Sequence, residues 1–141
     1  VQGDALKDLV LTAVVAWPEP HAGLLRAQFL VAVLAESKTD GHASVVLLRA
    51  RSNMETLVAQ VETRWALSAV RGSGWVDIAR GKGTETLLVC AAGTRKEGGG
   101  VYELEANGSI TMRWQSTVSA PTSVAVDAEC HAVISLKGVE G

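Results

Sequence analysis

The sequence predicts an all-β protein that repeats a four-stranded antiparallel meander. Short apolar runs rich in Val, Leu and Ile recur along the chain, and each has the length of one strand. Turn-forming residues separate the runs, and Asn107-Gly108 is the clearest joint. Because both residues tolerate positive φ, the pair predicts a type I′ hairpin turn. The runs also recur in groups, since Val76 and Val124 occupy equivalent places about 48 positions apart.

The first group of runs occupies residues 9–61. Pro18 and Pro20 end its first run, which suits a strand because proline cannot donate to a neighbouring strand. Asp40-Gly41 predicts the hairpin between the second and third runs. The four strand candidates are Leu9–Trp17, Ala27–Ala35, Ala43–Ala50 and Glu55–Val61.

Two segments of this group leave a helical alternative open. Ala5–Ala16 is rich in Ala and Leu, although its β-branched residues favour a strand. Met54–Val61 contains good helix formers, and Ser52 or Asn53 would cap a helix there. If both segments were helical, the chain would be a small α+β module suited to dimerisation.

The second group occupies residues 75–115, and an incomplete third group occupies 122–141. We interpret the glycine-rich segments Gly72–Gly74 and Gly98–Gly100 as turns or connectors. The six strand candidates are Trp75–Ala79, Leu87–Ala92, Val101–Leu104, Ile110–Trp114, Thr122–Val126 and Ala132–Leu136.

Two pieces of the chain resemble the WD-repeat and NHL-type β-propeller families. Gly99–Gln115 (GGVYELEANGSITMRWQ) is similar to the third and fourth strands of a blade, and Pro121–Asp127 (PTSVAVD) to the first strand of the next. The resemblance implies about two and a half blades, namely 9–61, 75–115 and an incomplete 122–141. It also implies that the ring is completed by a longer parent chain or by another polypeptide, since propellers have at least about four blades.

The chain departs from the WD-repeat pattern in two places. Trp114-Gln115 stands where a Trp-Asp pair would end a blade, and Gly41-His42 lies in a hairpin and does not open a blade. The hydrogen-bond network of WD repeats is therefore not carried over. A fainter similarity, to the amino-terminal blades of WD-repeat proteins of vesicle-tethering complexes, rests on AQFLVAVLA, VVLLRA and LLVCAAG in that order.

Composition narrows the classes of function. Hydrophobic residues make up 48% and charged residues 20% of the 141 residues, as in a globular domain with a core. The formal net charge of −2 argues against a general nucleic-acid-binding surface. No apolar run reaches the roughly 18 residues of a membrane span, so we expect no membrane insertion. We expect a cytoplasmic protein with reduced cysteines, and the start at Val1 suggests processing or a longer parent protein.

The reactive residues form no recognisable catalytic or metal-binding pattern. His21, His42 and His131 lack metal-ligand partners at i+2 to i+4, and Cys130 and His131 would point to opposite faces of a strand. A triad of Cys90, His131 and Asp127 is conceivable in space, but an inert core thiol explains Cys90 better. Gly81–Thr84 lacks the spacing of a phosphate-binding loop. We therefore predict no catalytic residue, metal or cofactor.

The expected function is a non-catalytic scaffold for other protein subunits. The candidate partner-binding residues are Trp65, Trp75, Trp114 and Arg95. Trp is enriched at binding hot spots, and packing between blades is the competing explanation for the three tryptophans. The alternative is an enzyme with a site in the propeller channel, partly outside this chain, which would use Asp77, Asp127 or His131.

Overall fold

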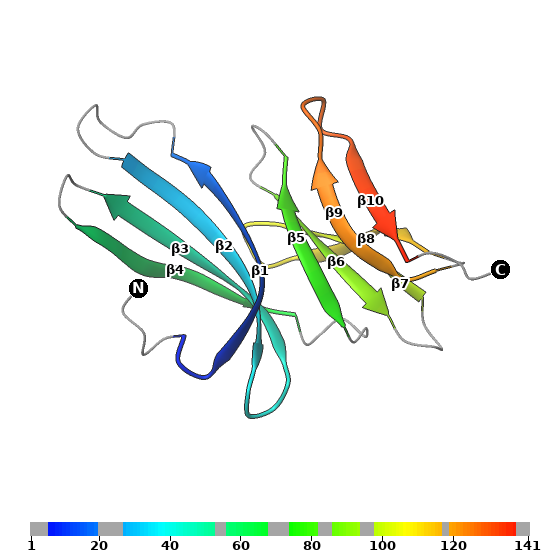
Figure 1. Cartoon of the computed structure of the whole chain (residues 1–141), viewed down its shortest axis with the longest axis horizontal. Coiled ribbons are helices and arrows are strands. Elements are labelled where there is room, and N and C mark those ends of the chain that lie inside the picture. The colour runs from blue at the N-terminus through cyan, green and yellow to red at the C-terminus, as the bar shows by residue number, and fades with distance from the viewer. Residues whose placement is uncertain are drawn as a thin grey trace. The chain divides into compact units, whose positions relative to one another are not determined.

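A computed structural model describes residues 6–19, 27–52, 56–67, 74–81, 86–93, 98–116 and 119–137. These residues form an all-β structure of antiparallel sheets with four, four and two strands (Figure 1), which confirms the predicted fold class. The strands are β1 (Leu9–Pro18), β2 (Ala27–Ser37), β3 (Ala43–Ser52), β4 (Leu57–Ala66), β5 (Trp75–Arg80), β6 (Leu87–Gly93), β7 (Gly98–Leu104), β8 (Ile110–Gln115), β9 (Pro121–Val126) and β10 (Ala132–Leu136).

The helical alternatives are wrong. β1 occupies most of the segment Ala5–Ala16, and β4 begins at Leu57 inside the segment Met54–Val61. Cross-strand pairing outweighs helix propensity in both places, since every residue of β1 except Thr12 pairs with β2. The described residues therefore do not support the α+β module.

The chain divides into two compact units, Val1–Leu67 and Ser68–Gly141. The first unit is one sheet in the order β1-β2-β3-β4. Bulges at Thr12 and Glu62 interrupt the pairing of the two outer strands. Its central strands β2 and β3 supply the most deeply buried side chains, among them Leu34 and Val45, which are completely buried.

The second unit contains a sheet in the order β5-β6-β7-β8 and the hairpin β9–β10. One face of the sheet packs against the hairpin, because Val124 of β9 joins a buried cluster with Ala79, Cys90 and Val101. Val126 and Ile134 of the hairpin pack against the same cluster. The two-stranded sheet thus has its apolar side covered within its own unit.

The prediction that Gly98–Gly100 forms a turn or connector is wrong, because these glycines open strand β7. A Cβ on Gly99 would collide with the backbone oxygens of Ala91 and Ala92 on β6. A Cβ on Gly100 would collide with the backbone oxygen of Trp114 on β8. Glycine is required here because three backbones approach one another closely. In the sequence alone, a run of glycines in such a strand looks the same as a run of glycines in a flexible loop.

The Asn107-Gly108 hairpin exists, but its predicted type I′ turn is wrong. Gly108 has a φ of 90°, whereas Asn107 is not among the described residues with positive φ. Gly108 N donates to Glu105 O at 2.9 Å, and Glu105 N donates to Ser109 O at 2.9 Å. This is the three-residue loop in which a type I turn precedes one left-handed residue. Asn107 Oδ1 accepts from Ser109 N at 2.9 Å, which satisfies the side chain without positive φ.

The β9–β10 loop repeats this geometry with a cysteine in place of the glycine. Asp127 N donates to His131 O at 3.0 Å, and Cys130 N donates to Asp127 O at 3.1 Å. Cys130 has a φ of 65°. Asp127 Oδ1 accepts from the backbone N of Glu129 and of His131, at 2.9 and 2.8 Å. These two hydrogen bonds hold the loop in a shape that places Cys130 in the left-handed conformation, which is unfavourable for residues with a Cβ.

The strand groups match the predicted ranges closely, although β4 continues past residue 61 to Ala66. Whether the groups are blades of a propeller stays a prediction. Arg95 and the segments 82–85 and 94–97 lie outside the described residues.

Candidate interaction surface

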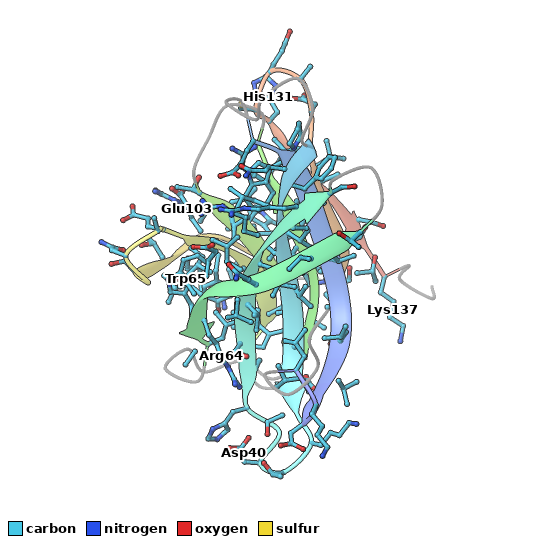
Figure 2. All side chains as sticks on the ribbon, turned by 90° about the vertical axis from the view of Figure 1, so that its left-hand side faces the viewer. Asp40, Arg64, Trp65, Glu103, His131 and Lys137 are labelled. Atoms are coloured by element: carbon cyan, nitrogen blue, oxygen red, sulfur yellow. The ribbon has the colours of Figure 1, made fainter. Side chains whose placement is uncertain are left out.

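The three described tryptophans among the predicted partner-binding residues occupy different environments. Trp75 is buried and packs edge-on against Tyr102, with ring centroids 5.2 Å apart. Trp65 is half-buried on β4, and Figure 2 labels it next to Arg64. Trp114 is exposed on the outer strand β8. Burial gives Trp75 a packing role, and partner binding by the others stays a prediction.

The second sheet separates two of these tryptophans. Trp75 pairs with Ala91, whereas Trp114 pairs with Val101 on the neighbouring strand of the same sheet. Side chains of residues paired across strands share a face, and successive residues alternate. Val101 belongs to the face covered by β9, and Tyr102 belongs to the opposite face. Trp75 and Trp114 therefore lie on opposite faces and do not form one site.

Several exposed apolar side chains that the sequence did not single out lie on one face of the first sheet. We call it the apolar face and define it by four exposed side chains, Leu11, Val14, Phe29 and Val61. The pairings Leu11↔Ala35, Val14↔Val33 and Leu48↔Val61 place them on the same side as the sheet's buried cluster. That cluster consists of Leu9, Val33, Ala35, Val46 and Leu48.

The opposite face of the same sheet combines buried apolar side chains, among them Leu34 and Val45, with charged ones. Arg49 Nη2 lies 2.9 Å from Glu19 Oε1, and its Nη1 lies 3.1 Å from Glu62 Oε1. Arg49 pairs with Leu30, the neighbour of Phe29 on β2, so both side chains lie on the face opposite to Phe29. β1 reads as a nearly continuous apolar run because both of its faces carry apolar side chains, Leu11 and Val14 on the apolar face and Val10 and Val15 on the opposite one.

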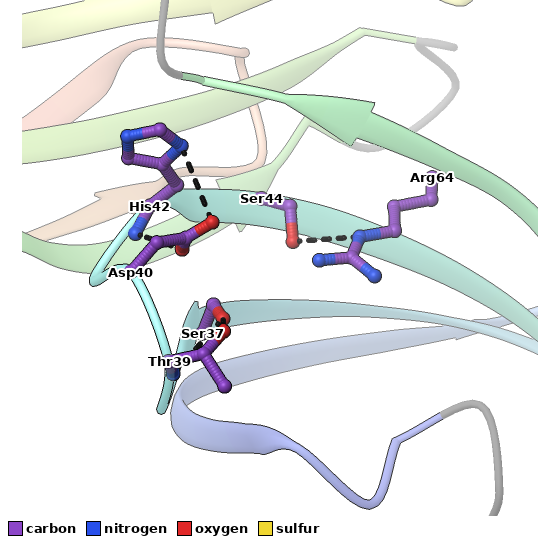
Figure 3. Close-up of polar contacts among 6 residues, drawn as sticks. All are labelled: Ser37, Thr39, Asp40, His42, Ser44 and Arg64. Atoms are coloured by element: carbon purple, nitrogen blue, oxygen red, sulfur yellow. Dashed lines mark hydrogen bonds and ion pairs between the residues drawn. The ribbon is translucent and has the colours of Figure 1, made fainter.

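Polar groups border the apolar face where β2 turns into β3 (Figure 3). Arg64, which pairs with Val46, donates from Nε to Ser44 Oγ at 3.2 Å. In the loop, Asp40 Oδ1 accepts from His42 N at 2.9 Å, and Asp40 Oδ2 lies 3.6 Å from His42 Nδ1. The backbone hydrogen bond from His42 is the main reason that the pKa of Asp40 is lowered. An apolar centre with a polar border is the usual anatomy of a protein interface.

Asp77, a candidate for channel chemistry, has a structural role. Its Oδ1 accepts from Ile78 N at 2.9 Å, and its Oδ2 accepts from Val124 N at 2.9 Å. Asp77 thereby joins β5 to β9 at the bulge where Val76 is left out of the pairing. Both carboxylate oxygens are occupied by backbone donors.

Asp127 and His131 do meet, at the exposed tip of the β9–β10 hairpin. His131 Nδ1 lies 3.3 Å from Asp127 Oδ2 and 3.6 Å from Glu129 Oε2. Backbone hydrogen bonds, first of all from His131, lower the pKa of Asp127. Within the described ranges no group of three or more His, Cys, Asp or Glu side chains has the geometry to hold a metal ion. The contact is that of a loop-stabilising pair.

Cys90 is unsuited to act as a nucleophile. It is completely buried in the cluster that Val124 covers. Burial, with a smaller effect from the negative charge of Asp77, raises the pKa of Cys90 to about 11. The thiol is therefore protonated at neutral pH, and only the thiolate is strongly nucleophilic. His131, its partner in the conceivable triad, is instead exposed and contacts Asp127 and Glu129.

Comparison of the chain with protein-family models, with curated proteins and with solved structures finds no match. Among the residues that the structure describes, no helix has the length and apolarity needed to cross a bilayer.

Proposed function

We propose that this chain is a non-catalytic interaction scaffold of the β-propeller type, whose apolar face binds another protein subunit. The observation that carries the proposal is the apolar face itself, where Val14 is 62% exposed beside the buried Val33. Apolar side chains that gather on an exposed face are a common feature of interaction sites, which supports a binding role for this face.

The packing of the second unit supports the propeller part of the proposal. Strand β9 opens a new sheet and lies against β5 and β6 of the preceding one. Consecutive blades of a propeller pack face to face in this sequential manner. The occupied carboxylate of Asp77 favours a scaffold over the channel enzyme. The burial of Cys90, which raises its pKa to about 11, argues against the triad with His131 and Asp127.

Site-specific photo-cross-linking tests the binding role. A benzophenone amino acid placed at Val14 reports on the apolar face, and the same label at Val10 is the matched control. Val10 is 50% exposed on the same strand, but it pairs with Glu36 and so lies on the opposite face.

We expect the label at Val14 to capture one protein reproducibly in cell extract, and the purified protein to bind the unlabelled chain reversibly. The label at Val10 should capture that protein much less. Equal capture from both positions, or no reversible complex, would refute the proposal. Turnover of a substrate that Asp127→Ala or His131→Ala abolishes would support the enzyme instead.

A further inference from the structure

Asn107-Gly108, at the tip of the β7–β8 hairpin, has a chemical reactivity that its role in the turn does not use. The backbone nitrogen of a residue that follows asparagine can attack the side-chain carboxamide, and glycine hinders this attack least because it has no Cβ. Asn107 is exposed, so water reaches the tip of the loop. The other asparagine of the chain, Asn53, precedes Met54, whose side chain hinders the same attack.

We propose that Asn107 is a site of spontaneous deamidation whose rate is set by opening of the β7–β8 loop. The nitrogen of Gly108 forms a bond to Cγ of Asn107, and Nδ2 leaves as ammonia with the proton that Gly108 N gives up. Water then opens the resulting cyclic imide at one of its two carbonyl carbons. Attack at Cγ gives aspartate, and attack at the main-chain carbon gives isoaspartate, which lengthens the backbone of the loop.

The folded loop holds the reacting groups away from the geometry of this reaction. Gly108 N donates to Glu105 O at 2.9 Å, and Asn107 Oδ1 accepts from Ser109 N at 2.9 Å. The third residue of a type I turn, here Asn107, has a ψ of about 0°. Ring closure requires rotation about its Cα–C bond until Gly108 N lies beside Cβ, which breaks the hydrogen bond to Glu105. The reaction therefore starts from the open loop, and its rate follows the fraction of open molecules.

The β2–β3 loop contains a matched pair that should stay unreacted. Asp40 precedes Gly41, and its Oδ1 accepts from His42 N at 2.9 Å, which is the same side-chain hydrogen bond that Asn107 makes two residues onward. Cyclisation of an aspartate needs the protonated carboxyl, because an ionised oxygen does not leave. The backbone hydrogen bond from His42 lowers the pKa of Asp40, so its carboxyl is ionised at neutral pH. Asp40 is therefore the control within the same chain.

The experiment incubates the full chain at mildly alkaline pH, in buffer and in guanidinium chloride. Peptide mapping by mass spectrometry measures conversion at Asn107 over time, and a methyltransferase that labels only isoaspartate identifies that product. We expect conversion in both solutions, about tenfold or more faster in the denaturant. Asn53 and Asp40 should remain unconverted in the denaturant over the time in which Asn107 reacts.

The variant Ala106→Pro changes the opening of the loop without touching the reacting groups. Proline is favoured at the second position of a type I turn, which Ala106 occupies, and restricts the open chain. It should slow conversion in buffer by about two- to fivefold and leave the rate in denaturant unchanged.

The proposal is overturned if Asn107 stays unconverted in the denaturant, or if it converts equally fast in both solutions. Faster conversion of a folded Ala106→Pro chain in buffer would also overturn it, since loop opening would then not set the rate. Unchanged circular dichroism identifies a folded variant. If Ala106→Pro does not fold, the comparison of buffer with denaturant in the unmodified chain decides.

Discussion

Replacing Cys130 by glycine should stabilise the second unit. Cys130 has a φ of 65°, in the left-handed region, and takes the place that Gly108 takes in the β7–β8 loop. A left-handed residue with a Cβ costs about 1–2 kcal/mol. Glycine loses about 0.5–1 kcal/mol through the greater freedom of the unfolded chain. The expected net gain in the free energy of unfolding is about 0.5–1 kcal/mol.

Thermal unfolding followed by circular dichroism measures this gain. For a unit of this size, about 1 kcal/mol corresponds to about 4–8 °C in Tm. Cys130→Gly should therefore raise the Tm of the second unit by about 2–8 °C. The reciprocal change Gly108→Ala, at a φ of 90°, should lower the Tm by a similar amount.

The control variant is Cys130→Ala, which removes the thiol but keeps the Cβ. It should give no increase in Tm, because the backbone strain remains. The reasoning would be refuted if Cys130→Ala stabilised as much as Cys130→Gly, or if Cys130→Gly lowered the Tm. Either result would mean that side-chain contacts of Cys130, and not its φ, decide the stability of the loop.

Four further predictions follow from the second unit. Gly99→Ala should destabilise it by about 1–3 kcal/mol, because the new Cβ meets backbone of β6; an unchanged denaturation midpoint would contradict this. Asp77→Ala should leave the buried Val124 amide without its acceptor at a cost of about 1–3 kcal/mol, with faster hydrogen exchange of that amide as the readout. Cys130 should react with a thiol reagent in the native protein at pH 8 and Cys90 only after unfolding. Because burial raises the Cys90 pKa from 9.0 to about 11, its contribution to stability is complete below pH 9 and is lost as pH rises toward 11; constant stability over that window would contradict the assignment.

The sequence was sufficient for the strands because apolar run length and turn residues are local signals. The run Leu9–Trp17 and its proline stop predicted β1 almost to the residue. The turn type was harder to predict from the sequence. Asn107-Gly108 correctly predicted a hairpin, but the loop length and the Asn107 side-chain hydrogen bond decided the type of its turn. Gly98–Gly100 was misread because the tight approach of β6 and β8 is a tertiary property.

The candidate site was predicted less well than the fold. Tryptophan content pointed to Trp75, which is buried against Tyr102. The apolar face depends on register, which brings Val14 of β1 and Val61 of β4 to one side of a sheet across strands distant in sequence. The Thr12 bulge reverses the alternation within β1, so counting along the strand from Leu9 assigns the residues after Thr12 to the wrong face.

The affinity of the captured partner for Val14→Lys, compared with Val10→Lys, tests the central claim most directly. A lysine on the apolar face would lose about 1.5 kcal/mol of valine burial and add a charge that must be desolvated, so we expect binding to weaken by about tenfold or more. Val10→Lys, on the opposite face of the same strand, should bind within about twofold of the unmodified chain. Equal affinities for the two variants would contradict the claim that the apolar face binds a protein subunit.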